Sequence, residues 1–211
     1  MKDCGWMLAL AADTSLPVLS VAIVSDAGLV GCVAMQGHGS RNEKLLPAID
    51  WLLAENGIDR RQIDLFAVTR GPGSFTGVRI GLATLQGLAL ALDRPLCAMS
   101  THEAVGLARP RDIRTAIIDD AGRGELYASI FDGGSEIVAP RLVTAVDRDA
   151  LLAGADVIAL SRFAQDENVA ACCARRAIEL EVSGRGGAYR DVTPIYVRLA
   201  EAEVKLQQKN G

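Results

Sequence analysis

The sequence predicts an α/β protein made of two similar lobes, each with the order strand, strand, strand, helix, strand, helix. Half of the 211 residues are hydrophobic and only 4% are aromatic, so the apolar residues are mainly the aliphatic ones that fill buried strands. The expected order of elements occurs twice along the chain without a matching repeat of sequence. A glycine-rich run from Gly71 to Gly81 joins an apolar strand to a long apolar helix, as in a βα unit.

The first lobe is expected to begin with three strands, because three short apolar runs are each bounded by turn residues. The second and third runs are joined by Asp26-Ala27-Gly28, which favours a tight turn. A helix follows, with Ser40 and Glu43 in the spacing of a capping box. Pro47 lies inside this helix and predicts a kink or a later start. The expected strands cover residues 6–12, 19–24 and 29–35, and the helix covers residues 42–55.

The remaining elements complete the first lobe and then repeat its order. The first lobe continues with strands over residues 65–68 and 95–99, a helix over 76–92 and a short helix capped by Ser100. The second half predicts strands over 115–118, 125–131, 136–138 and 156–160, and helices over 147–153 and 169–180. A Gly-rich loop over 183–187, a strand over 194–197 and a polar helix over 198–205 end the chain. We assign residues 1–105 to the first lobe, completed by the C-terminal segment 192–211, and residues 106–191 to a smaller second lobe.

Duplicated lobes of this order are the plan of actin-like (ASKHA, ribonuclease-H-like) proteins, in which a hairpin in each lobe grips the phosphates of ATP. The first lobe offers Asp13-Thr14-Ser15, whose carboxylate suits a phosphate-bound metal, but no glycine there lets a phosphate approach the backbone. The second lobe offers the partly glycine-rich residues 120–125, and residues 132–134 are ordinary hairpin-turn chemistry. The sequence therefore predicts a degenerate nucleotide site without catalytic residues, in which the weak binding candidates are Asp13, Gly73 and Ser74.

The turn at residues 71–74 has two interpretations that the sequence leaves open. Gly71 and Gly73 permit backbone angles closed to other residues, and the proline between them stiffens the turn. The free N–H groups of the following helix could bind an anion, or Ser74 or Thr76 could cap them in a turn that binds nothing. The turn is not a Walker loop, because Val78 stands where the lysine is needed, and it does not fit the G-x-S-x-G nucleophile elbow.

Charge and residue counts exclude several classes of function. The net charge is −4 and no basic stripe is present, so the chain is a poor candidate for gripping nucleic acid without a partner. The only histidines, His38 and His102, are far apart in the sequence, which predicts no metal site and no histidine-dependent nucleophile. Five cysteines without a C-x-x-C pair are typical of reduced thiols in a cytosolic protein. Neither a signal peptide nor a membrane span is expected, which predicts a cytoplasmic location.

The helix over residues 76–92 is apolar around most of its circumference, so both of its sides need a cover. Ala83, Gly87 and Ala91 form a stripe of small residues, which we expect Gly77 and Gly81 to continue. Such a stripe lets another backbone approach closely, so the helix lies either between the lobes of one chain or at a protein–protein interface. For the second possibility, the expected partner-interface residues are Leu46, Ile49, Leu53, Ile80, Ala83 and Gly87.

The run GPGSFTGVRIG at residues 71–81 resembles the signature of the TsaB (YeaZ) family. Further resemblances are LAADTS at residues 10–15, with Ala12 where isoleucine is usual, and EKLLP at 43–47. The other matching segments are QGLAL at 86–90, STHEA at 100–104, DAGRGELY at 120–127 and PIYVR at 194–198. Two departures are Arg41, where histidine is common, and Arg123, whose place in its turn is shifted.

This resemblance implies an actin-like fold with degenerate ATP sites and no catalytic centre. It implies a non-catalytic subunit that supports TsaD in threonylcarbamoyl transfer to N6 of adenosine 37 of tRNAs that read codons beginning with A. The implied partners are TsaD, the ATPase TsaE and a second copy of the chain, with tRNA reached only through the complex and no membrane contact. No cofactor is implied beyond ATP held weakly at the complex interface. The alternatives are a small ATP-dependent enzyme of the sugar-kinase-like class and a peptidase, which the lack of a histidine-based nucleophile or zinc set opposes.

Overall fold

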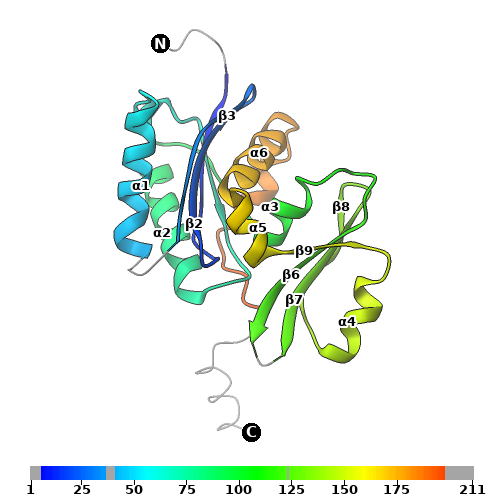
Figure 1. Cartoon of the computed structure of the whole chain (residues 1–211). Helices are drawn as coiled ribbons and strands as arrows, with labels where there is room; N and C mark the ends of the chain where they lie inside the picture. The colour runs from blue at the N-terminus through cyan, green and yellow to red at the C-terminus, as the bar shows by residue number, and fades with distance from the viewer. Residues whose placement is uncertain (1–5, 37–40, 123, 198–211) are drawn as a thin grey trace, which may run out of the picture.

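The computed structural model describes residues 6–36, 41–122 and 124–197, which form two sheets with helices packed around and between them (Figure 1). The first sheet has five strands in the order β3-β2-β1-β4-β5. Its strands are β1 (Leu8–Asp13), β2 (Leu19–Ser25), β3 (Gly28–Met35), β4 (Leu65–Thr69) and β5 (Leu96–Met99). The second sheet has four strands in the order β8-β7-β6-β9. They are β6 (Thr115–Gly122), β7 (Glu125–Asp132), β8 (Ser135–Val143) and β9 (Asp156–Ala159).

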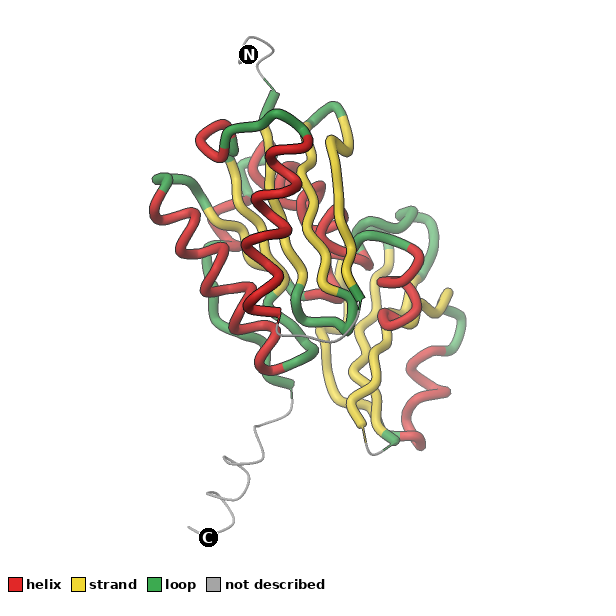
Figure 2. Tube along the Cα trace, turned by 60° about the vertical axis from the view of Figure 1, so that its left-hand side comes forward, coloured by secondary structure: helices red, strands yellow, loops and turns green. Residues whose placement is uncertain are grey.

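The first sheet places the ends of β1 and β4 side by side, because these strands run parallel while β1 and β2 are antiparallel. Helices α1 (Arg41–Glu55) and α2 (Phe75–Ala91) cover one face of this sheet and α6 (Val169–Val182) covers the other (Figures 1 and 2). Every residue of β2 and β4 is buried, which agrees with their mainly apolar sequences. The first face packs Leu10, Phe66 and Leu85 together, and the second face packs Ala9, Ala11 and Cys173.

The second sheet lies beside α3 (Thr101–Gly106) and α5 (Leu160–Asp166) (Figure 1). Helix α4 (Ala145–Leu152) lies on the side of this sheet that is away from the first sheet (Figure 1). An interlobe core joins Leu16 and Val105 of the first lobe to Ile117, Phe131 and Leu160 of the second. Two short 3-10 turns, Arg60–Gln62 and Gly186–Tyr189, complete the described elements. Each lobe therefore contains the expected order of three strands, helix, strand and helix, and the actin-like α/β fold predicted from the sequence is confirmed.

The structure differs from the expected lobe assignment at α6. This helix lies within residues 106–191, but it packs on β1, β2 and β4 of the first sheet, and the Ala170 N–H donates to Ser20 Oγ over 3.1 Å. The helix that completes the second lobe is α5, which the sequence analysis did not predict because it follows β9 without a turn signal. The apolar stripe of α6 indicates that one face of the helix is buried, but it does not indicate which sheet covers that face.

Three smaller expectations have mixed outcomes. The turn between β2 and β3 and the Ser74 cap of α2 are confirmed. Helix α1 begins at Arg41 and continues through Pro47, so the later start is wrong. Residues 194–197 form no strand, although the Ile195 N–H donates to the Arg70 carbonyl over 2.7 Å. The expected cap at Ser40 and helix over 198–205 fall outside the described residues.

Candidate functional site

Asp13 ends β1 as a fully buried carboxylate that accepts hydrogen bonds from its own turn and from β4. Its Oδ1 accepts from Ser15 Oγ over 2.6 Å, from the Ser15 N–H over 3.3 Å and from Thr69 Oγ1. Its Oδ2 accepts from the Leu16 N–H over 3.4 Å. Burial raises the pKa of Asp13, and the hydrogen bonds from Ser15, Thr69 and Leu16 act in the opposite direction. Both carboxylate oxygens of Asp13 thus accept hydrogen bonds within the protein.

The glycine-rich turn packs directly on this Asp13 turn. A Cβ atom built on Gly73, whose φ is +150°, would lie 2.5 Å from the Ser15 carbonyl oxygen, and the Ser74 N–H donates to that same oxygen over 2.7 Å. The Gly71 carbonyl accepts from the Thr101 N–H over 2.8 Å, which ties the turn to the start of α3. Gly73 is therefore required for close backbone packing within the protein, whatever else the turn binds.

The start of α2 is seated on Thr14 in the same way. Ser74 Oγ caps the helix by accepting from the Gly77 N–H over 3.2 Å. Thr14 Oγ1 donates to the Gly77 carbonyl over 2.6 Å, and a Cβ atom on Gly77 or Gly81 would lie under 3.0 Å from Thr14. Asp13, Gly73 and Ser74 thus do meet, as a nucleotide site would require, but their contacts are explained by packing, and nucleotide binding remains a prediction.

Asp119 on β6 occupies the second-lobe position that corresponds to the end of β1. Its pKa is raised to about 6, chiefly by burial and further by repulsion from Asp120 and Asp13. The adjacent turn is closed by the Gly122 N–H, which donates to Asp120 Oδ1 over 2.7 Å. Among the residues that the structure describes, no group of three or more His, Cys, Asp or Glu side chains is arranged to hold a metal ion.

His102 lies at the start of α3 and is fully buried. Its Nδ1 forms a hydrogen bond with Ser129 Oγ on β7 over 2.8 Å, while its Nε2 has no partner among the described residues. Burial lowers the pKa of His102 to about 3, so the ring is neutral near pH 7. His102 therefore acts as a buried contact between the lobes, and His38 lies outside the described residues.

The outward face of α1 and α2 carries the residues that the sequence analysis predicted as a partner interface. Leu46, Ala83 and Gly87 are exposed on it, and Ile80 is half-buried. Ile49 and Leu53 instead pack in the core beneath α1, with 2% and 5% of their surfaces exposed, so their assignment to a partner interface is wrong for the folded chain. Three large exposed side chains on these helices were missed: Trp51 at 53%, Phe75 at 40% and Leu90 at 83%.

The small residues of α2 do not form one stripe. Gly77 and Gly81 face inward onto Thr14, while Ala83 and Gly87 face outward, where a Cβ atom on Gly87 would meet nothing within 4 Å. The second lobe lies on the other side of the first sheet from α2 (Figure 1). The alternative in which α2 is sandwiched between the lobes is therefore wrong, and no described part of the chain covers its outer face (Figure 1).

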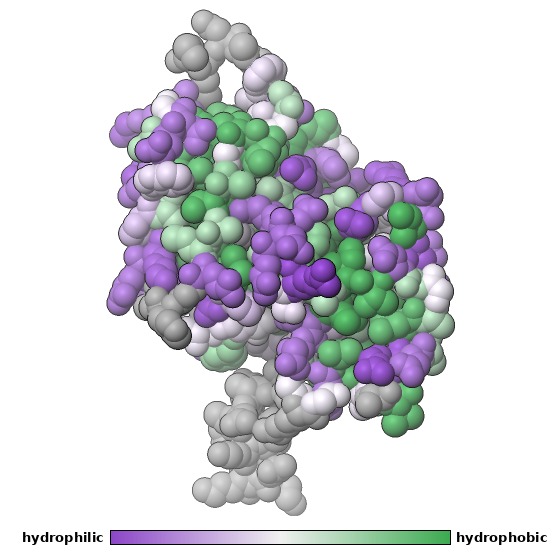
Figure 3. Space-filling view, viewed as in Figure 1, coloured by the Kyte–Doolittle hydropathy of each residue, from purple (hydrophilic) through white to green (hydrophobic). Residues whose placement is uncertain are grey.

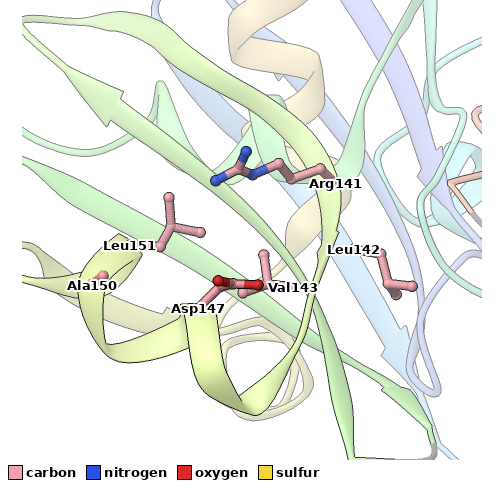
Figure 4. Close-up of a pocket in the computed structure, with 6 residues that line it drawn as sticks. All are labelled: Arg141, Leu142, Val143, Asp147, Ala150 and Leu151. Atoms are coloured by element: carbon pink, nitrogen blue, oxygen red, sulfur yellow. The ribbon is translucent and has the colours of Figure 1, made fainter.

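A cavity of about 540 Å³, which the sequence did not predict, lies between β8 and α4 in the second lobe. Arg141 and Leu151 extend toward it from opposite sides, with Asp147 at the start of α4 (Figure 4). Apolar side chains also gather on this lobe, where Val157 is 44% exposed (Figure 3). No helix among the described residues is long and apolar enough to cross a membrane.

Comparison with known proteins places this geometry in a family. The family model described as "TsaD: tRNA N6-adenosine threonylcarbamoyltransferase" matches residues 19–193. The tRNA threonylcarbamoyladenosine biosynthesis protein TsaB of Bacillus subtilis is 30% identical, over 94% of this chain and 97% of that protein. The chain belongs to the TsaB (YeaZ) family. TsaB of Haemophilus influenzae is 38% identical over a shorter stretch, which covers 57% of this chain and 52% of that protein.

Solved structures agree with this membership. YeaZ from Pseudomonas aeruginosa has a TM-score of 0.67 and 25% identity, over 90% of this chain and 99% of that one. A second P. aeruginosa structure, described as an uncharacterized protein with similarity to peptidase YEAZ, has a TM-score of 0.71 and 28% identity, over 91% and 100% of the two chains. The resemblance stated from the glycine-rich signature is thereby confirmed over nearly the whole chain.

Proposed function

We propose that this chain is a non-catalytic subunit that supports a TsaD transferase in forming threonylcarbamoyladenosine at adenosine 37 of tRNAs that read codons beginning with A. The observation that carries the proposal is the outer face of α1 and α2, which none of the described segments covers (Figure 1). Leu90 is 83% exposed there, and Ala83 and Gly87 leave room for a second backbone. An apolar helix face of this kind is stabilised by a protein partner.

The Asp13 turn supports a role without chemistry of its own. A kinase of the sugar-kinase-like class needs space for phosphates at this turn and a carboxylate open to a metal or substrate. Here the Ser74 N–H donates to the Ser15 carbonyl, so both groups of the turn are already bonded within the protein. The Asp13 carboxylate accepts a hydrogen bond from the hydroxyl of Thr69. The sugar-kinase alternative is therefore the weaker one, and no observation favours a peptidase.

Binding to TsaD from the same organism tests the proposal. Leucine at position 83 or 87 should hold the partner backbone away and weaken binding about ten- to a hundredfold, since overpacking a tight contact costs about 1–3 kcal/mol. Both positions are exposed, so the melting temperature of Ala83→Leu and Gly87→Leu should stay near that of the wild type. Wild-type affinity for TsaD in both variants would contradict the docking surface.

The same surface is proposed for self-association of the chain in the absence of TsaD. The ATPase TsaE would join the TsaD complex, tRNA would be reached only through TsaD, and ATP would bind weakly at the subunit interface. Calorimetric titration of ATP into the chain, with and without TsaD, tests this point. Tight binding of ATP to the chain alone, lost in Asp13→Asn, would favour the enzyme alternative.

A further inference from the structure

Three side chains from two distant parts of the chain stack together at the start of α2. The guanidinium carbon of Arg79 lies 3.7 Å from the ring centroid of Phe75 and 5.7 Å from that of Tyr196. The two rings are 4.9 Å apart, and Arg79 Nε donates to the Tyr196 hydroxyl over 2.8 Å. Phe75 is 40% exposed and Tyr196 is 37% exposed, so the cluster faces solvent while holding Arg79 in one orientation.

The segment that carries Tyr196 is held in place by the end of β4. The Ile195 N–H donates to the Arg70 carbonyl over 2.7 Å, and Arg70 Nη1 donates to the Thr193 carbonyl over 3.2 Å. The same Nη1 pairs with Asp191 Oδ2 over 3.1 Å. These contacts fix the tyrosine ring before any partner arrives, which lowers the entropic cost of binding at this point.

Among residues 6–36, 41–122 and 124–197, no side chain or carbonyl bonds to the two Nη groups of Arg79. Within the described residues its hydrogen bond is made by Nε, and no carboxylate lies within ion-pair distance of it. Two other arginines of the first lobe do form ion pairs, Arg60 with Asp50 over 2.8 Å and the half-buried Arg70 with Asp191 over 3.1 Å. A guanidinium with a stacked face and two free Nη groups is suited to bind a carboxylate through two parallel hydrogen bonds.

We propose that Phe75, Arg79 and Tyr196 anchor the outer face of α2 to a partner protein surface that places an Asp or Glu carboxylate on Arg79. Arg79 lies one helical turn before Ala83 on the exposed side of α2, so the anchor is continuous with the surface described above. Tyr and Arg are among the residue types that contribute most binding energy at interfaces, and Phe is enriched there. The exposed Leu90 on the same helix favours a protein over a free phosphate, because a phosphate would leave that leucine uncovered.

This inference rests on the proposed function, since TsaD is the partner to be tested. Arg79→Gln and Tyr196→Ala should each weaken TsaD binding about tenfold. The wild-type affinity should fall as salt is raised, and the Arg79→Gln affinity should fall less. Tyr196→Phe keeps the ring and loses only its hydrogen bond to Arg79, so it should bind nearly as well as the wild type. Trp6→Ala is the matched control, because Trp6 is 56% exposed but precedes β1, at the opposite end of that strand from the Asp13 turn.

The outcomes separate the two proposals. If the wild type does not bind TsaD, the proposed function and this inference both fail. If the wild type binds but Arg79→Gln and Tyr196→Ala bind equally well with unchanged melting temperatures, only the anchor is refuted. If inorganic phosphate or ATP binds the wild type and not Arg79→Gln, the cluster is a phosphate site and the inference is also overturned.

Discussion

Replacing Gly77 by alanine should destabilise the protein strongly, although alanine is the better helix former. A Cβ atom at Gly77 would lie well under 3.0 Å from the backbone carbonyl of Thr14, a group that cannot rotate away. Separating the two also strains the hydrogen bond from Thr14 Oγ1 to the Gly77 carbonyl. Overpacking costs about 1–3 kcal/mol and a buried hydrogen bond contributes about 1 kcal/mol, while the gain in helix propensity is about 1 kcal/mol. The expected net loss in the free energy of unfolding is about 1–3 kcal/mol.

Gly87→Ala is the matched control on the same helix, because its Cβ atom would meet nothing within 4 Å. Without a steric cost, alanine should raise the free energy of unfolding by about 0.5–1 kcal/mol. Urea denaturation followed by circular dichroism measures both variants on one scale. If Gly77→Ala is as stable as Gly87→Ala, then the signature glycines are not there to seat α2 on Thr14, and our account of the turn is wrong.

Other predictions concern the buried polar groups. Asp13→Ala should lower the free energy of unfolding by about 3 kcal/mol or more, because it leaves buried donors unpaired; Asp13→Asn should cost less, and threonylcarbamoyladenosine measured by mass spectrometry should persist in cells with folded Asp13→Asn protein. His102 has a folded-state pKa of about 3 against an ordinary 6.5, so the unfolded chain takes up a proton that the folded chain does not, and its contribution to stability falls by about 1.4 kcal/mol per pH unit below pH 6.5. Asp119, raised to about 6, opposes this loss between pH 6 and 3.8, because the folded state then binds the extra proton. Urea unfolding of the wild type and His102→Gln should therefore show that the difference between their free energies of unfolding is about 2 kcal/mol smaller at pH 5 than at pH 7.5. The same difference at both pH values would contradict a neutral buried ring.

Local signals in the sequence predicted the elements better than their partners. The Asp26-Ala27-Gly28 turn and the Ser74 cap are set by neighbouring residues, and both are present. Helix α6 itself was predicted, but its assignment to the second lobe was wrong, because its apolar stripe could pack on either sheet. The short loop after α5 returns the chain to β1 and β2 and so decides between the two sheets. Helix α5 was not predicted, because β9 leads directly into it at Leu160 and no capping side chain marks its start.

The interface residues illustrate a limit of the same kind. Successive residues turn by about 100° around a helix, so the step from Gly81 to Ala83 carries the small residues to the far side. The small residues thus divide into an inner pair, Gly77 and Gly81, that packs on Thr14, and an outer set, Ala83, Gly87 and Ala91, that faces solvent. On α1, the residues Leu46 and Ile49 are neighbours by spacing, yet one is exposed and the other is covered by the sheet. The exact sheet position, which the sequence does not state, decides between them.

The filled Asp13 turn and the open face of α2 have a common cause. The α2 helix starts close to β1 because Gly73, Gly77 and Gly81 let its backbone contact Ser15 and Thr14. That close approach occupies the space beside Asp13 with protein atoms, so the turn stabilises the fold through hydrogen bonds. The same seating fixes the position of Phe75 and Arg79 at the helix start, where Tyr196 meets them. The glycines that let α2 pack on Thr14 also set the position of the proposed docking surface, so Gly77→Ala should weaken TsaD binding as well as stability, whereas Gly87→Ala should raise stability slightly.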